Sequence, residues 1–174
     1  MRLVTTFVAC VGMAVSSAWA DCAGRAEKKV RFSNNAVADT FVVERFGKDC
    51  GNAKVVLFVT TAEEGWHALH VAELTNLAGE TVTPANLKKV LADIAMRIEG
   101  VGRTPLENWD SLQNAGKDGN PWRGTPMVKA EYERLTKARP RAVIVPTDAA
   151  RGMMWVWDGN GMLKRPVAFI YYGD

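Results

Sequence analysis

The clearest pattern of hydrophobic and polar positions lies between Thr83 and Gly100. Thr83 can cap a helix, Pro84 suits its first turn, and Gly100 can end it. The large apolar residues of this segment recur at the 3.6-residue helical period: Leu87, Val90, Leu91, Ile94 and Ile98. The pattern predicts an amphipathic helix with one buried stripe.

Strand-like patterns surround this helix. Short runs rich in β-branched residues cover 38–46 and 54–61. Two further runs, 141–148 and 153–173, follow the helix, and the second is divided by Asp158-Gly159-Asn160-Gly161, which is strong turn material. The C-terminal part therefore predicts three strands, at least two of them in a hairpin.

A second Thr-Pro start, Thr125-Pro126, predicts a helix that runs to Ala138 with Val128, Tyr132 and Leu135 facing inward. Strands at both ends and helices in the middle predict an α+β fold. We expect a single domain with a mostly antiparallel sheet and two to three helices packed on one face.

The segment "EEGWHALH" holds both histidines of the chain. Thr61 followed three residues later by Glu64 matches a capping box, and Gly79 stands where a helix would stop. These signals predict a helix from Ala62 to Ala78, with His67, Val71, Leu74 and Ala78 on one face. The alternative is a strand followed by a hairpin within 69–83, since Gly65 is unfavourable in a helix.

Residues 1–20 carry one early cation, an apolar run and a small-x-small ending at Ala20, as secretory signal peptides do. We expect cleavage there, a mature domain over 21–174, and a periplasmic or secreted location; a retained membrane anchor is the alternative. Export agrees with the cysteines, because Cys22 and Cys50 remain as a pair in an oxidising compartment. The sequence predicts a disulfide between them.

The charge is small and evenly spread. Loss of Arg2 with the signal peptide lowers the formal net charge from +3 to +2, and no segment is strongly basic. We therefore expect no nucleic-acid partner. We also expect no stable membrane anchor after cleavage.

Candidate chemistry is sparse. On a helix, Glu63, His67 and His70 share a face and could hold a metal, whereas a strand would turn the two histidines to opposite sides and exclude a joint site. The order does not match a zinc-protease motif, so half-buried packing is the favoured role and we predict no metal site. Asp110 and Asp148 are the best-placed carboxylates for acid/base chemistry. No serine or cysteine nucleophile motif and no phosphate loop is found, and we predict no cofactor.

Tryptophan is the more informative residue type. Trp109 and Trp122 lie in a long segment of little periodicity, 100–125, beside Asp110 and Arg123. Trp155 and Trp157 are two apart in a predicted strand and share one face. Aromatic rings next to polar groups suit a binding surface. The alternative is that the strand pair belongs to the core and that the loop pair holds the loop onto it.

These features predict an exported binding protein, such as an inhibitor, an immunity factor or an accessory subunit, that acts on an envelope protein or a cell-wall glycan. Two alternatives stay open. One is a small exported hydrolase, metal-dependent or carboxylate-based. The other is a structural envelope component whose C-terminal strand, from Val167, adds to a neighbour's sheet.

Overall fold

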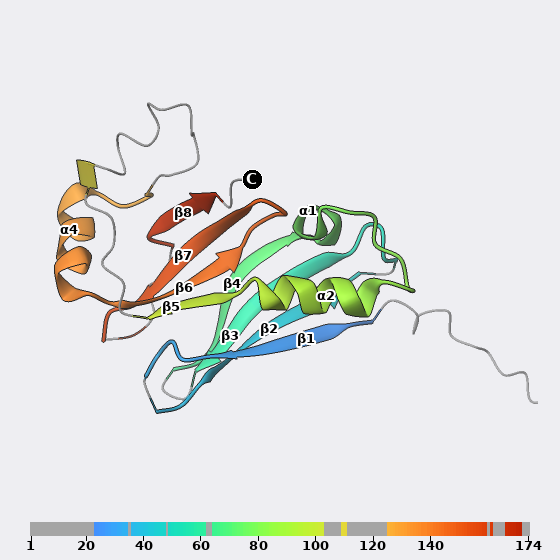
Figure 1. Ribbon diagram of the computed structural model, residues 1–174, viewed down its shortest axis with the longest axis horizontal. Helices are drawn as coiled ribbons and strands as arrows, with labels where there is room; N and C mark the ends of the chain where they lie inside the picture. Colours follow the sequence, from blue (N-terminus) through green and yellow to red (C-terminus); the bar gives the residue numbers. More distant parts are fainter. Residues whose placement is uncertain are drawn as a thin grey trace, which may run out of the picture.

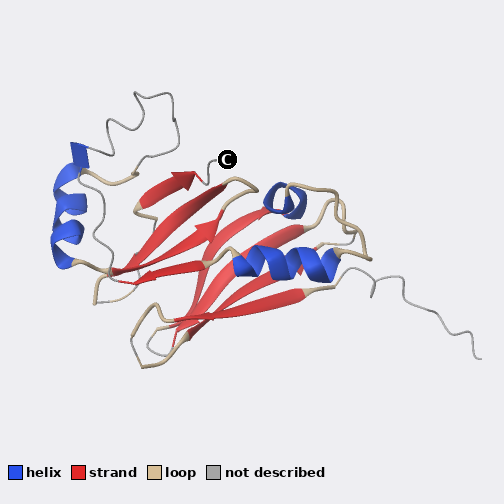
Figure 2. Cartoon of the chain, viewed as in Figure 1, coloured by secondary structure: helices blue, strands red, loops and turns tan. Residues whose placement is uncertain are grey.

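The structure is a computed structural model. It describes residues 23–34, 36–47, 49–61, 64–102, 109–110, 125–159, 161 and 166–171. Within these ranges the strands form two four-stranded antiparallel sheets, and helices lie against both of them (Figures 1 and 2). The α+β class with antiparallel strands is confirmed, and the strands divide between two sheets.

The first sheet is formed by four strands that follow one another along the chain: β1 (Arg25–Val30), β2 (Asp39–Phe46), β3 (Lys54–Thr61) and β4 (Gly65–Glu73). Each strand pairs with the next in antiparallel fashion. The runs predicted over 38–46 and 54–61 are β2 and β3.

The second sheet has the same order of neighbours: β5 (Glu99–Gly102), β6 (Arg141–Pro146), β7 (Arg151–Trp157) and β8 (Ala168–Tyr171). β7 and β8 pair as an antiparallel hairpin across the segment that contains Asp158 and Gly159. The three C-terminal strands predicted from the sequence are therefore confirmed.

The described helices are α1 (Leu74–Ala78), α2 (Leu87–Met96) and α4 (Lys129–Ala138). The whole predicted stripe of α2, including Ile98 just beyond the helix, is buried. The helix ends at Met96 and not at Gly100, because Glu99 and Gly100 pair with β6. Strand pairing therefore ends the helix four residues before the predicted glycine.

The helix predicted from Thr125 begins later, at Lys129. Tyr132 and Leu135 are buried as expected, but Val128 stands at the N-cap and is 68% exposed. Met127 is buried in its place. The inward stripe therefore starts before the helix does.

The predicted helix from Ala62 to Ala78 is wrong over most of its length. Residues from Gly65 to Glu73 form β4, and only Leu74–Ala78 is helical. The backbone N–H of Glu64 does donate to Oγ1 of Thr61, at 3.0 Å, as in a capping box. That bond belongs to the β3–β4 connection, where Gly65 takes a φ of +78° and the chain turns back. The predicted stop is correct, since Gly79 caps α1 with a φ of +71°.

A β-bulge decides where the two histidines point. Phe58 is paired with Ala68 but Leu57 with His70, so Leu69 is an extra residue in β4. His67 stands opposite Val59 and His70 opposite Leu57, and both of these partners belong to the main core. The expectation that a strand would separate the histidines is therefore wrong, because the bulge returns both to one side.

The main core lies between the sheets. One cluster of buried side chains joins β1 to β4, α1 and α2 with β6 and β7 of the second sheet. A smaller cluster lies on the other side of the second sheet, where α4 covers it. Helices therefore cover different faces, with α2 on the inner face of the first sheet and α4 on the outer face of the second (Figure 1).

The predicted signal peptide and Cys22 lie outside the described residues, so cleavage and the Cys22–Cys50 disulfide stay predictions. Cys50 is 5% exposed and belongs to the main core. Among the described helices, none has both the length and the apolar character needed to span a bilayer.

Candidate functional site

The most distinctive surface of the described chain is the outer face of the first sheet. We define it as the face formed by alternate side chains of β1 to β4 that point away from the main core. Strand pairing aligns these side chains in rows across the sheet. Its residues are Arg25, Glu27, Lys29, Thr40, Val42, Glu44, Phe46, Lys54, Val56, Phe58, Thr60, Trp66, Ala68, Val71 and Glu73.

The middle of the outer face is apolar. An antiparallel sheet with one solvated face normally carries polar residues there. Here Val42 and Phe58 are only 1% and 8% exposed, yet they belong to neither core cluster. On the same face, Trp66 and Val71 are 60% and 55% exposed.

Trp66, near the start of the edge strand β4, forms an aromatic pair with Phe58 of β3. Their ring centroids are 5.5 Å apart and their planes are inclined at 47°. The pair comes from adjacent strands, because Trp66 stands opposite Thr60, two residues from Phe58 on β3. Phe58 supports one side of the indole ring while most of Trp66 stays open to solvent.

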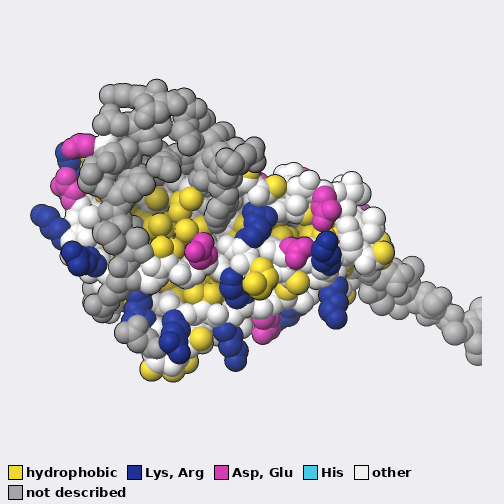
Figure 3. Space-filling view, in the orientation of Figure 1, with side chains coloured by type: hydrophobic (Ala, Val, Ile, Leu, Met, Phe, Trp, Pro, Cys, Tyr) yellow, Lys and Arg dark blue, Asp and Glu magenta, His cyan; other side chains and the backbone are white. Residues whose placement is uncertain are grey.

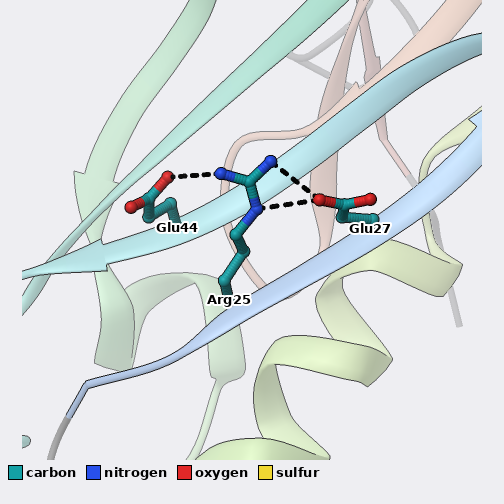
Figure 4. Close-up of polar contacts among 3 residues, drawn as sticks. All are labelled: Arg25, Glu27 and Glu44. Atoms are coloured by element: carbon teal, nitrogen blue, oxygen red, sulfur yellow. Dashed lines mark hydrogen bonds and ion pairs between the residues drawn. The ribbon is translucent and has the colours of Figure 1, made fainter.

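Arg25 connects the aromatic pair to the charged part of the outer face. Its guanidinium carbon lies 5.7 Å from the centroid of the Phe58 ring, which is a cation–π distance. Its nitrogens contact Glu27 at 2.7 Å and Glu44 at 3.2 Å, and Figure 4 shows the arginine between the two carboxylates. Two acids and a ring thus hold Arg25 in one orientation.

Charge and hydrophobicity are separated across the sheet. Most charged residues of the outer face lie on β1 and β2, and most apolar ones on β3 and β4. Aromatic and arginine side chains of this kind are enriched at specific protein interfaces.

The predicted binding residues of the second sheet are in the core. Trp155 and Trp157 share a face, as expected, and are 4% and 5% exposed. The ring of Trp157 meets Phe32 edge-on, with centroids 6.0 Å apart. Both tryptophans are therefore core residues, which is the alternative given for them above, and neither supplies a binding surface in this structure.

The predicted binding loop is described only in part. Trp109 is half-buried and meets Tyr132 edge-on at a centroid distance of 5.8 Å, which attaches it to the cluster under α4. The Asp110 side chain is 84% exposed and lies 3.9 Å from Nζ of Lys129. Trp122 and Arg123 lie outside the described residues, so a binding role of the loop stays a prediction.

The histidines share a side of β4 but contact different groups. Nε2 of His67 lies 3.2 Å from Oε2 of Glu64. Nε2 of His70 lies 3.4 Å from the carbonyl oxygen of Thr147, and burial lowers the pKa of His70 below 6.5, although Thr147 and Asp148 oppose this. Glu63 is outside the described residues, and within the described ranges no three His, Cys, Asp or Glu side chains form a cluster suited to a metal ion.

The two candidate carboxylates have separate surroundings. Asp110 lies near Lys129 of α4, whereas Asp148 lies in the β6–β7 connection, 2.5 Å from Nε of Arg151. Oδ1 of Asp148 also accepts from the backbone N–H of Ala150. These contacts fix Asp148 within its own turn and give it a structural role.

A shallow cavity of about 490 Å³ lies beside the end of α2, lined by Lys28, Met96, Arg97, Glu99 and Ala149. The two basic side chains that line this cavity donate hydrogen bonds to backbone carbonyls. Lys28 donates to Met96, and Arg97 donates to Leu77 and Asp148. Figure 3 shows the face of the molecule that carries α2, where basic side chains are spread among acidic and apolar ones. On the described part of this side, cations and carboxylates are interspersed.

The helix predicted from Ala62 to Ala78 contains Trp66, so the sequence does not predict the aromatic pair that Trp66 forms with Phe58. One signal could have found it. In "KVVLFVTT" apolar residues occupy both sides of the strand, Val56 and Phe58 as well as Val55, Leu57 and Val59. An antiparallel strand that is apolar on both sides needs other residues to cover both of its faces.

No known protein family, curated protein or solved structure matches this chain significantly.

Proposed function

We propose that the chain is an exported binding protein and that the outer face of the first sheet is its docking surface for another envelope protein. An inhibitor, an immunity factor or an accessory subunit would act in this way. The observation that carries the proposal is Trp66, an indole that is 60% exposed on the outer face and contacts Phe58 of the adjacent strand.

A protein partner fits the outer face better than a glycan does. Glycan and other small-ligand sites need convergent polar groups in a concave surface. The polar groups beside Phe58 are already engaged with one another, because Arg25 contacts both Glu27 and Glu44. What remains open is aliphatic and aromatic surface, which a complementary apolar patch on a protein would bury.

The proposal is tested by photo-crosslinking in the cells that make the protein. A photoreactive phenylalanine analogue replaces Trp66 in one variant and Met96 in a control, since Met96 is 68% exposed but lies at the end of α2. Crosslinked proteins are identified by mass spectrometry. We expect one envelope protein to be captured from position 66 and not from position 96.

Capture alone is not sufficient, so affinity is measured with the purified partner. We expect Trp66→Ala to weaken binding at least about tenfold, since exposed tryptophans at interface centres are typical hot spots, and Met96→Ala to leave the affinity unchanged. Equal affinities of the wild type and Trp66→Ala would contradict the proposal. Binding of isolated cell-wall glycan that is lost in Trp66→Ala would instead indicate the glycan.

A further inference from the structure

The outer face leaves a problem for the free protein. Trp66, Val71 and Phe46 are each at least 50% exposed on one side of one sheet. Exposed apolar side chains that share one face of a sheet mark a protein interaction surface more often than scattered ones do. We infer that, in the absence of its partner, the outer face pairs with the outer face of a second copy of this chain. This rests on the proposed function, because both treat the same face as a protein-docking surface.

The cross-strand rows suit a twofold arrangement. One central row consists of Arg25, Glu44, Val56 and Val71. The adjacent row consists of Glu27, Val42, Phe58 and Ala68. A twofold axis that runs between these rows, at right angles to the strands, places each row over the other row of the second copy.

That exchange brings complementary groups together. On β1, Arg25 would face Glu27 of the second copy, and Glu27 would face Arg25 of the second copy. On β3, Val56 would face Phe58 of the second copy. Each strand lies over its own counterpart, so β3 and β4, which carry most of the apolar residues, meet the same strands of the second copy, as packed sheets aligned within about 30° allow. On β2, Glu44 would face Val42 of the second copy, so the opposite charges that meet across the axis are Arg25 and Glu27.

The total charge of the outer face does not oppose this pairing. Three cations and three carboxylates lie on it: Arg25, Lys29, Lys54, Glu27, Glu44 and Glu73. Equal numbers of opposite charges leave no net repulsion between two identical faces. The complementary contact is the one on β1, where Arg25 and Glu27 exchange partners across the axis.

The size of the face predicts weak pairing. With strands of eight residues and a strand spacing of about 4.8 Å, four strands cover a footprint of about 500 Å² on each copy. The total of about 1,000 Å² is at the lower limit for a specific interface. A weak dimer of this kind would dissociate on dilution and would release the face to a tighter partner.

The inference is tested by sedimentation equilibrium of the chain that begins at Asp21, over a range of concentrations. We expect the wild type to dimerise reversibly. Arg25→Glu and Glu27→Arg should each weaken self-association at least about tenfold, because each places like charges opposite each other across the twofold axis. Lys88→Glu, at an exposed position of α2, is the control and should dimerise as the wild type does.

The decisive measurement mixes the two charge variants in equal amounts. Across the twofold axis of a mixed pair, both contacts join opposite charges, while each chain still lacks its own Arg25–Glu27 pair. We therefore expect Arg25→Glu and Glu27→Arg to associate with each other about as strongly as the wild type does with itself. Recovery in the mixture cannot arise from contacts within one chain.

A wild type that stays monomeric at every concentration would overturn the inference, and so would a mixture that fails to recover. The crosslinking experiment separates these failures from failure of the proposed function. Capture of an envelope protein at position 66 without dimerisation would overturn only the dimer. Crosslinks to the chain itself and to no other protein would support the dimer and contradict the proposed function.

Discussion

The two sheets have the same strand order and share one core, but their outer faces differ. In the second sheet, Tyr132 and Leu135 of α4 pack against the side chains that point away from the main core, among them Val156 and Ala142. Among the described residues no helix covers the corresponding face of the first sheet, where Trp66 is 60% exposed. Packing against α4 accounts for the apolar outer residues of the second sheet, whereas Trp66 and Val71 on the first sheet stay exposed and carry the binding proposal.

The comparison is closest between β3 and β6. Both strands are apolar on both sides, as "KVVLFV" and "RAVIVP" show. Ala142 on the outer side of β6 is 1% exposed beneath α4. Phe58 on the outer side of β3 contacts Arg25 and Trp66, which belong to the same face. The same strand pattern therefore carries a structural role in one sheet and a candidate interface in the other.

The largest expected effect is a difference in the free energy of unfolding between variants of the two outer faces. Tyr132→Ala should lower the free energy of unfolding by about 3–5 kcal/mol, as removal of fully buried aromatic side chains does. Trp66→Ala should change it by no more than about 1 kcal/mol, because the indole is mostly exposed. Urea denaturation of both variants measures the difference. Similar losses in the two variants would mean that the outer face of the first sheet is as structural as that of the second.

The amphipathic helix and most strands could be predicted because local pattern decides them. The α2 stripe and the β7–β8 turn need only helical period and turn chemistry. The structure of segment 62–78 could not be predicted in this way, because Thr61 and Glu64 make the same hydrogen bond in a strand connection as in a helix cap. Only the backbone at Gly65 and the pairing with β3 distinguish the two.

The candidate surface could be predicted less well than the fold. Whether an apolar residue is core or interface depends on what covers it, and coverage comes from elements distant in sequence. Trp155 and Trp157 are the same residue type as Trp66, yet they are buried in the core between the sheets, whereas Trp66 is exposed on the outer face of the first sheet. The Leu69 bulge, which places both histidines on one side, likewise arises from pairing and has no mark in the sequence.

A smaller effect tests whether the charged half of the outer face is held rigidly. Asp39 is 2% exposed, and its carboxylate accepts from the backbone N–H groups of Phe32 and Ser33 and from the Ser33 hydroxyl. These bonds close the β1–β2 connection. Asp39→Ala leaves buried donors without an acceptor and should destabilise the fold by about 2–3 kcal/mol.

The control for Asp39 lies in the same connection. Asn34 accepts from the N–H groups of Ala36 and Val37, but these bonds are exposed to solvent. Asn34→Ala should therefore cost less than about 1 kcal/mol, since water replaces the lost acceptor. Thermal unfolding of both variants decides the point, and equal melting temperatures would show that the buried carboxylate does not fix β1.

The smallest effect concerns the contact between the two sheets. His70 of β4 reaches the Thr147 carbonyl in the β6–β7 connection, and burial lowers the pKa of His70 below 6.5 despite nearby Asp148. The unfolded chain then binds a proton more readily than the folded one, so stability is complete above about pH 6.5 and falls as the pH drops below it. His70→Gln should reduce that loss between about pH 7.5 and pH 5.5, whereas His67→Gln should retain it. The free energy of unfolding is measured by urea denaturation at each pH. If His70→Gln kept the full pH dependence, groups other than His70 would cause the loss of stability in acid.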